Sequence, residues 1–396
     1  MQVASCSLFT IFYIVTIVLS CGSISQHPFG PSDCLATFKT VENLVRCFGL
    51  FTIRNNTLTY YDWVTSLKPT ASQRNAWAKT VNKILLNSLE CNRSIVQSDI
   101  AQWVDVRHFP ALNPKHCVLY ERSYVIHPTE SYSRRFEKGW GAVIVRMVNS
   151  SIPSENTRNW LHFSAAHPIS DGEVVKQAGA LYDEVRPRTL TIPGADRFAI
   201  IHPSECQPKS NVMDAAHSNR TMFHATLVAI ERFYNRQSKN DTLNDNFTPK
   251  ARELTRLPVY IQFHGMAETS CSNITIFLSV GASATDGNRI YSNPNSTINQ
   301  LASALKRNFP LATTRIETVA SDTQHSGHHD CGLVATTNVF GRVVNGVKLG
   351  TECSVSATRD GITGRFLHAE QKRNARNDYS DWIYALNEIF PIVYGQ

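Results

Sequence analysis

The sequence lacks the short motifs that mark several common enzyme classes. It contains no GxSxG nucleophile elbow, no P-loop and no Rossmann glycine pattern. These absences argue against a serine hydrolase of the nucleophile-elbow type, a P-loop nucleotide-binding enzyme and a dinucleotide-binding oxidoreductase. No two cysteines show CxxC spacing, which argues against a zinc ribbon.

Dense runs of positive charge are also missing. The 39 Lys and Arg side chains exceed the 32 Asp and Glu side chains, for a net charge of +7. Because they form no cluster, nothing favours a nucleic-acid partner. Hydrophobic residues make up 42% and charged residues 18% of the 396 positions, so the chain can bury a substantial core, in one large domain or two ordinary ones.

The first 22 residues contain no charged side chain. Leu8–Leu19 is almost wholly apolar, and small residues follow at Ser20, Gly22 and Ser23. This pattern predicts a secretory signal peptide over residues 1–23, although the usual positive N-terminal region is missing. The apolar core is short for a membrane span and no later segment reaches the required length, so we expect a secreted protein without stable membrane insertion.

Eight cysteines follow the predicted signal peptide, and an even number in an exported chain indicates up to four disulfides. Cys34 with Cys47 and Cys331 with Cys353 are the expected local pairs. We expect the four cysteines before residue 118 to crosslink the N-terminal region. The eight cysteines are Cys34, Cys47, Cys91, Cys117, Cys206, Cys271, Cys331 and Cys353.

N-x-S/T sequons are frequent, which is typical of a eukaryotic glycoprotein. Asn219 and Asn273 lie near the candidate site described below, so we expect these two to carry no glycan. The sequons begin at Asn55, Asn92, Asn149, Asn219, Asn240, Asn246, Asn273 and Asn295.

Hydrophobic patterns predict an accessory region over residues 24–140 and an α/β domain over residues 141–396. In the accessory region, apolar residues three and four apart predict an amphipathic helix at Ser72–Glu90. In the second region strands and helices alternate, which predicts a mixed, largely parallel sheet with helices on both faces, as in phosphorylase- and hydrolase-like folds. The expected strands are Gly141–Val148, His162–Ala166, Phe198–His202, Val259–His264, Ile274–Val280, Val339–Val344 and Arg365–Glu370. The expected helices are Glu173–Val185, Thr221–Tyr234, Asn299–Asn308 and Trp382–Ile389.

Three of these strands end in a histidine or an acidic residue. His167 and Pro168 follow one strand, which must end there because proline cannot donate to a sheet ladder. His264 ends a second strand, and strand alternation puts His368 and Glu370 on one face of a third. Because ligands bind at the carboxyl ends of strands in open α/β sheets, we expect these ends to converge on one site. The alternatives are a turn histidine at 167 and histidines satisfied within the core.

The segments HPISD, DAAHSNRTMFHA, QFHG and HAEQKR, in this order, resemble signatures of N-formylglutamate amidohydrolases and, more distantly, of zinc carboxypeptidases. The likeness spans roughly residues 140–390 and lies in motif order more than in identity. It implies a mixed α/β sheet with one catalytic zinc. By position, it implies His167 and His264 as histidine ligands, Asp171 as the carboxylate ligand and Glu370 as the general base.

Such a ligand set is chemically consistent with hydrolysis. Two neutral imidazoles and one carboxylate leave a fourth zinc position for water, whose pKa the metal lowers. A neighbouring carboxylate can then take the proton as the water attacks an amide carbonyl.

One position departs from the carboxypeptidase pattern. Carboxypeptidases have a glutamate three residues after the first histidine, where this chain has Ser170. Asp171 and Glu173 lie four and six residues after His167, so either could be the carboxylate ligand. If neither coordinates, the domain is an inactive relative.

Further polar residues surround these motifs. Asp214, His217, His224 and His368 could bind substrate or support the ligands through hydrogen bonds. Alternatively, Asp214 or Ser218 caps a helix and His224 packs against the sheet.

Three arginines are candidates for binding a substrate carboxylate. Arg373 and Arg376 follow Glu370 closely, and the resemblance implies an arginine clamp near this point. Arg220 is the third candidate, and surface salt bridges are the alternative for these side chains. The sequence offers two interpretations of His325, His328 and His329: a second metal site or a solvated loop.

The patterns together predict a secreted, glycosylated, zinc-dependent hydrolase that cleaves an amide or related acyl bond in a small carboxylate-bearing or peptide-like molecule. Two other classes stay open. One is a non-catalytic secreted binding protein that retains a hydrolase fold. The other is a metal-dependent esterase or deacetylase that acts on cell-wall material.

Overall fold

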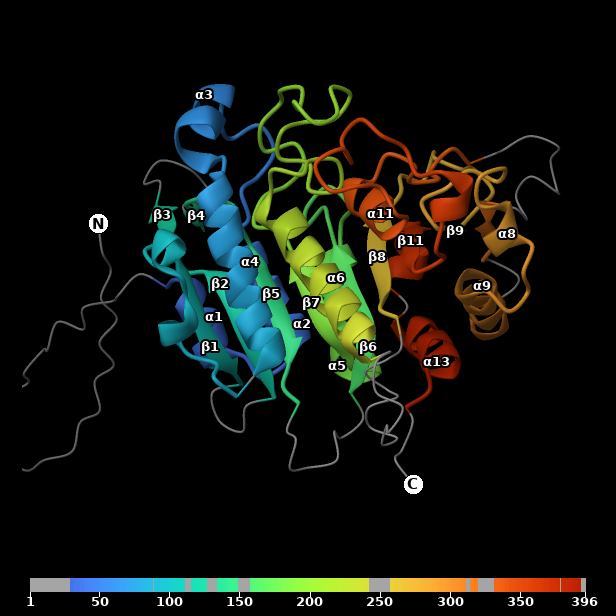
Figure 1. Ribbon diagram of the computed structural model, residues 1–396, viewed down its shortest axis with the longest axis horizontal. Coiled ribbons are helices and arrows are strands. Elements are labelled where there is room, and N and C mark those ends of the chain that lie inside the picture. The colour runs from blue at the N-terminus through green and yellow to red at the C-terminus, as the bar shows by residue number, and fades with distance from the viewer. Residues whose placement is uncertain are drawn as a thin grey trace, which may run out of the picture.

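The computed structural model describes residues 29–87, 89–110, 115–126, 134–148, 157–241, 257–310, 314–319, 331–377 and 379–392. A nine-stranded sheet runs through its centre, in the order β1-β2-β5-β7-β6-β8-β11-β9-β10 (Figure 1). In that order the strands are Val104–Phe109, His116–Glu121, Ala142–Arg146, Pro187–Ile192, Arg158–Ala165, Val259–Gly265, Phe366–Gln371, Ile276–Ser279 and Ile316–Thr318. A separate hairpin pairs β3 (Tyr124–Ile126) with β4 (Arg134–Phe136).

The centre of the sheet is parallel and its flanks are mixed. The neighbours β7, β6, β8 and β11 all run in the same direction. β5 pairs with β7 antiparallel, and β9 pairs with β11 antiparallel. The carboxyl ends of four adjacent strands therefore meet at one edge of the sheet.

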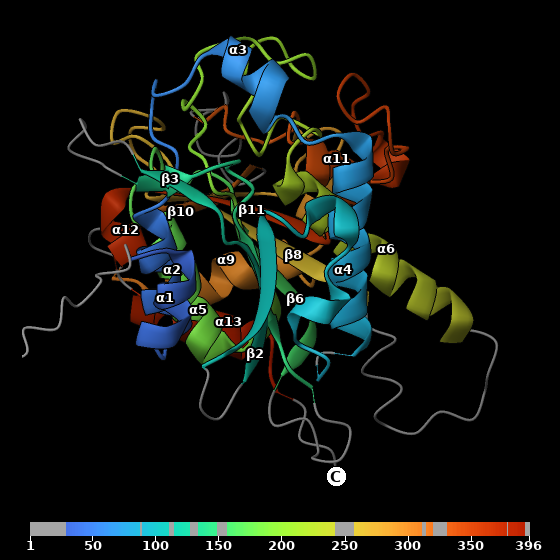
Figure 2. The ribbon, with the colours of Figure 1, turned by 90° about the vertical axis from the view of Figure 1, so that its left-hand side faces the viewer.

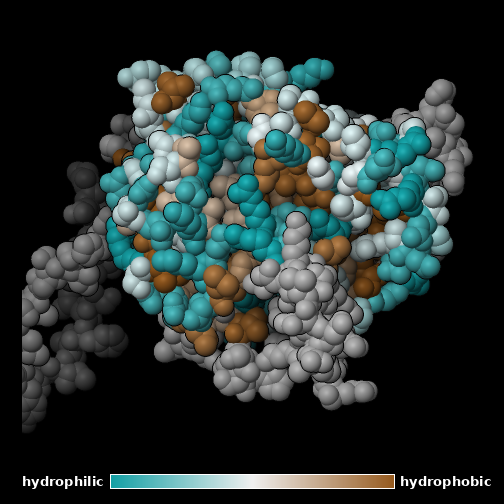
Figure 3. All heavy atoms as spheres, in the orientation of Figure 1, coloured by the Kyte–Doolittle hydropathy of each residue, from teal (hydrophilic) through white to brown (hydrophobic). Residues whose placement is uncertain are grey.

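Helices cover both faces of the sheet (Figure 2). One face, here called the α5 face, packs against α1 (Pro31–Thr37), α2 (Val41–Gly49), α5 (Val174–Val185), α9 (Thr297–Asn308) and α13 (Tyr379–Ile389). The other, the α6 face, packs against α4 (Ala71–Leu86), α6 (Met222–Asp241) and α11 (Val339–Val344). The predicted fold class, a mixed α/β sheet with helices on both faces, is confirmed. The outer surface over the α6 face is mostly hydrophilic, with hydrophobic residues gathered near α11 (Figure 3).

Strand alternation sorts side chains between the two faces. In β6, Leu161 and Phe163 point into the core of the α5 face, so His162 and Ser164 point to the α6 face. In β8, Phe263 lies in the α5-face core. The same alternation therefore puts Gln262 and His264 on the α6 face.

Two predicted strands are wrong. Residues 198–202 form turns, because the Asp196 carboxylate accepts hydrogen bonds from the amides of Phe198, Ile169 and Ser170. Val339–Val344 is the helix α11, whose first turn is capped by the Asn338 side chain. In that segment the cap and tertiary packing override the strand preference of valine.

One central strand was not predicted. β7, Pro187–Ile192, alternates polar and apolar residues, yet all six are buried. The buried Arg188 guanidinium donates to the carbonyls of Arg146 and Leu85. These backbone acceptors allow a charged residue inside the sheet.

All eight cysteines after residue 28 form disulfides. Cys34–Cys47 is confirmed as predicted, and Cys91–Cys117 crosslinks the same region. The predicted pair Cys331–Cys353 is wrong, since Cys331 bonds Cys271 and Cys353 bonds Cys206. Helix α11 lies between positions 331 and 353, so their proximity in sequence does not make them neighbours in space.

The N-terminal region contributes directly to the sheet. β1 and β2 precede residue 141 and extend the sheet beyond β5. The division into 24–140 and 141–396 stays a prediction. Short helical segments complete the fold: α3 (Tyr60–Asp62), η1 (Trp63–Leu67), η2 (Arg93–Ile95), η3 (Ser98–Ile100), α8 (Asn288–Tyr291), η4 (Arg359–Gly361) and α12 (Arg373–Asn377).

Several predicted features lie wholly or partly outside the described residues. These are the signal peptide at 1–23, the sequons at Asn149, Asn240 and Asn246, and the histidines His325, His328 and His329. In the parts of the chain that the structure describes, no helix is long and apolar enough to span a membrane.

Candidate metal centre

The three predicted strand ends meet at the carboxyl edge of the parallel strands. His167 follows β6, His264 lies near the end of β8, and His368 and Glu370 lie in β11. Cross-strand register places Glu370 directly opposite His264. The sheet therefore brings residues about 100 positions apart in the sequence to one place.

Three potential ligand atoms form a compact triangle, here called the ligand triangle. Nδ1 of His167 lies 3.0 Å from Oδ2 of Asp171, and Nδ1 of His264 lies 3.2 Å from the same oxygen. The two Nδ1 atoms are 3.2 Å apart. In a tetrahedral zinc site with bonds of about 2.0–2.1 Å, neighbouring ligand atoms lie about 3.3–3.4 Å apart. The triangle is slightly tighter than that spacing, and all three residues are buried.

Hydrogen bonds set which nitrogen of each ring faces the triangle. Nε2 of His264 lies 2.8 Å from Oε1 of Gln262, an oxygen that can only accept, so Nε2 carries the proton. The Asn338 amide donates to the same Oε1. Nε2 of His167 likewise lies 3.0 Å from a carboxylate oxygen of Asp214. With these tautomers, the Nδ1 lone pairs of both rings point at the Asp171 carboxylate. Three acceptor atoms this close repel one another unless a proton or a cation lies between them.

The pKa values of the two buried histidines show which of them holds a proton at this position. Burial lowers the pKa of His167, but Asp171 and Asp214 raise it more strongly, to about 10. Burial lowers the pKa of His264 to about 4. The pKa values of Asp171 and Asp214 lie below their ordinary value, because the attraction of His167 outweighs burial. One positive charge is therefore stabilised at the triangle.

Asp214 connects the triangle to a second group of side chains. Its Oδ1 lies 3.1 Å from Nδ1 of His217, and its Oδ2 lies 3.0 Å from Nη2 of Arg197. Nη1 of Arg197 reaches within 3.4 Å of Nδ1 of His167. His167, Asp214 and His217 form another set with metal-ligand spacing, but Arg197 already supplies a positive charge to Asp214.

Sequence patterns did not single out Arg197 or Asp196. Both follow β7, the strand that was not predicted. Asp196 holds the turn after His167 through the amides of Ile169 and Ser170. The segment Pro-Gly-Ala-Asp-Arg at 193–197 directly follows β7. Had β7 been predicted, its position at a strand end would have marked Asp196 and Arg197 as candidate site residues.

Glu370 and His368 lie beside the triangle. Oε1 of Glu370 is 3.5 Å from Nε2 of His368, and the His368 and His264 rings are 4.5 Å apart. Burial, and then repulsion from Asp171, raises the pKa of Glu370 to about 8. Nδ1 of His368 is buried without a hydrogen-bond partner among the described residues. His264, His368 and Glu370 form a third set with metal-ligand spacing.

Other predicted site residues lie elsewhere. The Glu173 side chain is exposed and faces Lys176 at 3.8 Å, so Asp171 is the carboxylate that meets the histidines. His224 pairs with Glu352 at 3.5 Å instead of with the triangle. Arg220 is exposed.

The two arginines after Glu370 differ in their positions. The backbone amide of Arg373 donates to the exposed Glu268 side chain. Arg376 lies against the backbone of Gly265, where an added Cβ would clash with its guanidinium. Its Nη1 donates to the carbonyl of Gln371. Of the predicted arginines, Arg376 therefore lies beside the strand ends that carry the site.

Comparisons with known proteins place few constraints on the chain. It matches no protein-family model, and no curated protein is detectably similar to it. Among solved structures, it is similar to gene product Atu2144 from Agrobacterium tumefaciens, with 11% sequence identity and a TM-score of 0.30. That similarity covers 59% of this chain and 88% of the other. At this TM-score the likeness supports no argument about fold or function.

Proposed function

We propose that the protein is a zinc-dependent hydrolase that cleaves an amide or related acyl bond of a small carboxylate-bearing substrate. The ligand triangle of His167, Asp171 and His264 is the observation that carries the proposal. Nε2 of each ring is held by another side chain, so both Nδ1 atoms face the same buried carboxylate, and a cation can replace the proton that His167 otherwise carries there. Two imidazoles and one carboxylate are a ligand set that zinc hydrolases use, with one position left for water or substrate.

The metal would supply Lewis acidity toward the substrate carbonyl and ease the deprotonation of a water molecule. His167 and His264 would hold it through Nδ1, and Asp171 through Oδ2. Asp214 and Gln262 keep the opposite nitrogens protonated and so orient both rings.

Glu370 is suited to move protons in this reaction. Its side chain is only 12% exposed and lies beside His264, next to the triangle. Its pKa is raised to about 8 by burial and by Asp171, and a cation at the triangle would lower that value by offsetting the charge of Asp171. In the proposed reaction, Glu370 accepts a proton from the attacking water and delivers it to the leaving nitrogen.

Arg197 places a positive charge beside the triangle, with Nη1 3.4 Å from Nδ1 of His167. Its side chain is 29% exposed, so one edge of the guanidinium can meet a ligand while Nη2 stays on Asp214. A guanidinium in this position is suited to a carboxylate or to a carbonyl oxygen that gains negative charge.

The disulfides support a site of action outside the cell. Cys34–Cys47, Cys91–Cys117, Cys206–Cys353 and Cys271–Cys331 leave no cysteine unpaired among the described residues. Disulfides of this number are typical of extracellular chains. We propose that the protein is secreted and glycosylated.

Metal analysis of protein purified without added metal tests the proposal. We expect about one equivalent of zinc per chain. Glu370→Gln should abolish turnover of N-acyl amino acids and keep the zinc, since this side chain lies outside the ligand triangle. A native protein without any bound metal would contradict the proposal.

Paired substrates separate the alternatives. An amide and an ester with the same acyl group distinguish an amidohydrolase from an esterase. Full zinc occupancy without turnover of either substrate would favour the non-catalytic binding protein.

A further inference from the structure

A pocket lies on the α5 face, on the opposite face of the sheet from the ligand triangle. It has a volume of about 230 Å³ and is formed by residues of α2, β4, β5, β7 and the first turn of α5, together with the loops beside them. Val45, Phe48, Phe136 and Ile192 form its apolar wall, and all four are buried within the core of the α5 face. Because these side chains are fixed by core packing, the pocket is preformed.

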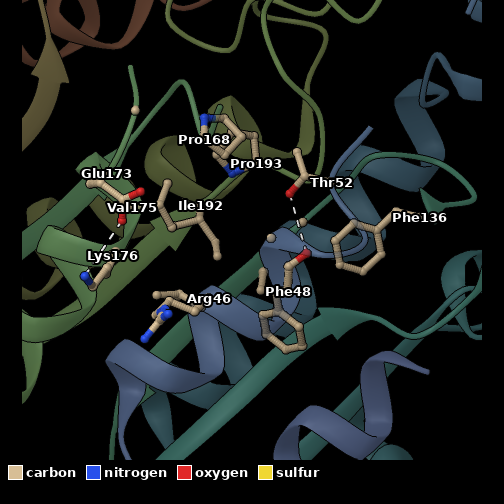
Figure 4. A pocket seen from close by; sticks show the side chains of 15 residues that line it. Arg46, Phe48, Thr52, Phe136, Pro168, Glu173, Val175, Lys176, Ile192 and Pro193 are labelled. Atoms are coloured by element: carbon tan, nitrogen blue, oxygen red, sulfur yellow. Dashed lines mark hydrogen bonds and ion pairs between the residues drawn. The ribbon is translucent and has the colours of Figure 1, made fainter. Parts of the chain in front are cut away.

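The pocket has two chemically different ends (Figure 4). The aromatic rings of Phe48 and Phe136 lie on one side. Arg46 and Lys176 lie on the other side, and the Arg46 side chain is exposed. Lys176 also faces Glu173 at 3.8 Å, a distance that leaves its ammonium hydrogens available to a ligand.

We propose that this pocket binds a small amphipathic carboxylate. Its apolar chain would pack against Phe48 and Phe136, and its carboxylate would pair with Arg46 and Lys176. Because a water-sized group occupies about 30 Å³, a volume of about 230 Å³ holds about seven or eight non-hydrogen atoms. A six-carbon carboxylate has this size. The inference does not rest on the proposed hydrolase function, since neither zinc nor turnover enters it.

The pocket shares one turn with the ligand triangle. Pro168, Gly172 and Glu173 line the pocket, whereas His167 and Asp171 of the same turn meet at the triangle. The two sites are therefore separate in their contacts and adjacent in the chain.

A substitution that places a large side chain in the pocket tests the proposal. Gly49 lines the pocket, and a Cβ added there meets no atom within 4 Å. A side chain can therefore start at this position without a clash, and we expect the ring of Gly49→Phe to occupy part of the pocket. Gly332 is the matched control, because a Cβ there also meets no atom within 4 Å and the residue does not line the pocket.

The measurement is a calorimetric titration of the full chain with hexanoate, hexan-1-ol and hexylammonium, after each variant is shown to melt cooperatively. We expect hexanoate to bind with a Kd of about 1 mM and the other two probes at least ~10-fold more weakly. Gly49→Phe should weaken hexanoate binding at least ~10-fold, Arg46→Gln about 5- to 10-fold, and Gly332→Phe not at all. No saturable hexanoate binding, equal binding of hexan-1-ol, or unchanged binding in both Gly49→Phe and Arg46→Gln would overturn the proposal.

Discussion

The two faces of the central sheet bury very different side chains beneath similar helices. On the α5 face, residues such as Leu161, Phe163 and Phe263 form a continuous apolar core. On the α6 face, the same strands bury polar side chains such as Gln262 and His264. Burial of polar groups costs free energy unless each finds a partner. Both faces have an apolar core beneath their helices, but only the α6 face also holds the reactive groups of the ligand triangle.

The turn after β6 joins these two faces. Its residues alternate between them, with His167 and Asp171 at the ligand triangle and Pro168 and Gly172 at the pocket. Gly172 has φ of +66°, a left-handed conformation that glycine adopts without strain. From this difference we expect substitutions at the triangle to weaken metal binding, and substitutions in the α5-face core to lower the stability of the fold.

The largest expected effect is the loss of metal affinity in His264→Leu. This change removes one ligand of the triangle, so zinc affinity should fall on the order of 1000-fold, or about 4 kcal/mol. The Tm of the metal-free protein should fall less than in Phe48→Ala below, because Asp171 keeps its hydrogen bond with His167 and Gln262 keeps its bond from Asn338. Equilibrium dialysis and thermal melts measure both quantities. Unchanged zinc affinity would show that the triangle is not the metal site.

Phe48→Ala should show the opposite pattern. Phe48 is buried against Tyr120 and Phe136 in the core of the α5 face. The cavity should lower the free energy of unfolding by about 3–5 kcal/mol. Zinc affinity, measured by the same dialysis at a temperature where the variant is folded, should stay the same. A joint loss of stability and zinc binding would contradict the division between the faces.

Gln262→Leu should have an intermediate effect on zinc. It removes the acceptor that holds Nε2 of His264 protonated, so Nδ1 is no longer fixed as the ligand atom. We expect a 10- to 100-fold loss of zinc affinity, the range known for such supporting residues. Gln262→Glu, which keeps an acceptor at this position, should retain most of the affinity. Equal losses in both variants would indicate a packing role only.

The smallest effect concerns acid stability. Hydrogen bonds from His224 and Asn219 outweigh burial and lower the pKa of Glu352 to about 2, from an ordinary value of 4.5. A lowered folded-state pKa contributes stability above pH 4.5 that is lost as the pH falls toward 2. Glu352→Gln should therefore be less stable than the parent by about 1 kcal/mol at neutral pH, with a gap that closes in acid. Urea unfolding at several pH values measures the gap.

Asp183, on the α5 face, provides the contrasting case. Burial raises its pKa, although its carboxylate accepts bonds from the amides of Val41 and Glu42. Its contribution is greatest below its unfolded pKa and falls as the pH rises. The stability gap to Asp183→Asn should therefore change with pH in the opposite direction. If the stability gaps of Glu352→Gln and Asp183→Asn changed with pH in the same direction, the prediction would be wrong.

Local patterns were sufficient for much of the architecture. Period-two and period-3.6 spacing located β6, β8, β11, α5 and α6, and with them the positions of His167, His264 and Glu370. The same rules failed where polar residues were buried, as in β7, and where a cap turned valines into a helix, as in α11. In β7 the acceptors for Arg188 are distant in sequence, whereas in α11 the adjacent cap Asn338 acts together with packing against the sheet.

By itself, the sequence determined which residues could reach the edge of the sheet, because strand alternation and strand ends are local properties. Only the tertiary structure decided that Asp171 and not Glu173 meets the histidines, and that Arg197 and Asp214 join them. These choices depend on the turn after β6, which Asp196 holds from the loop that follows β7. The pocket on the α5 face was likewise invisible in the sequence, because its walls come from five separate elements, α2, β4, β5, β7 and α5.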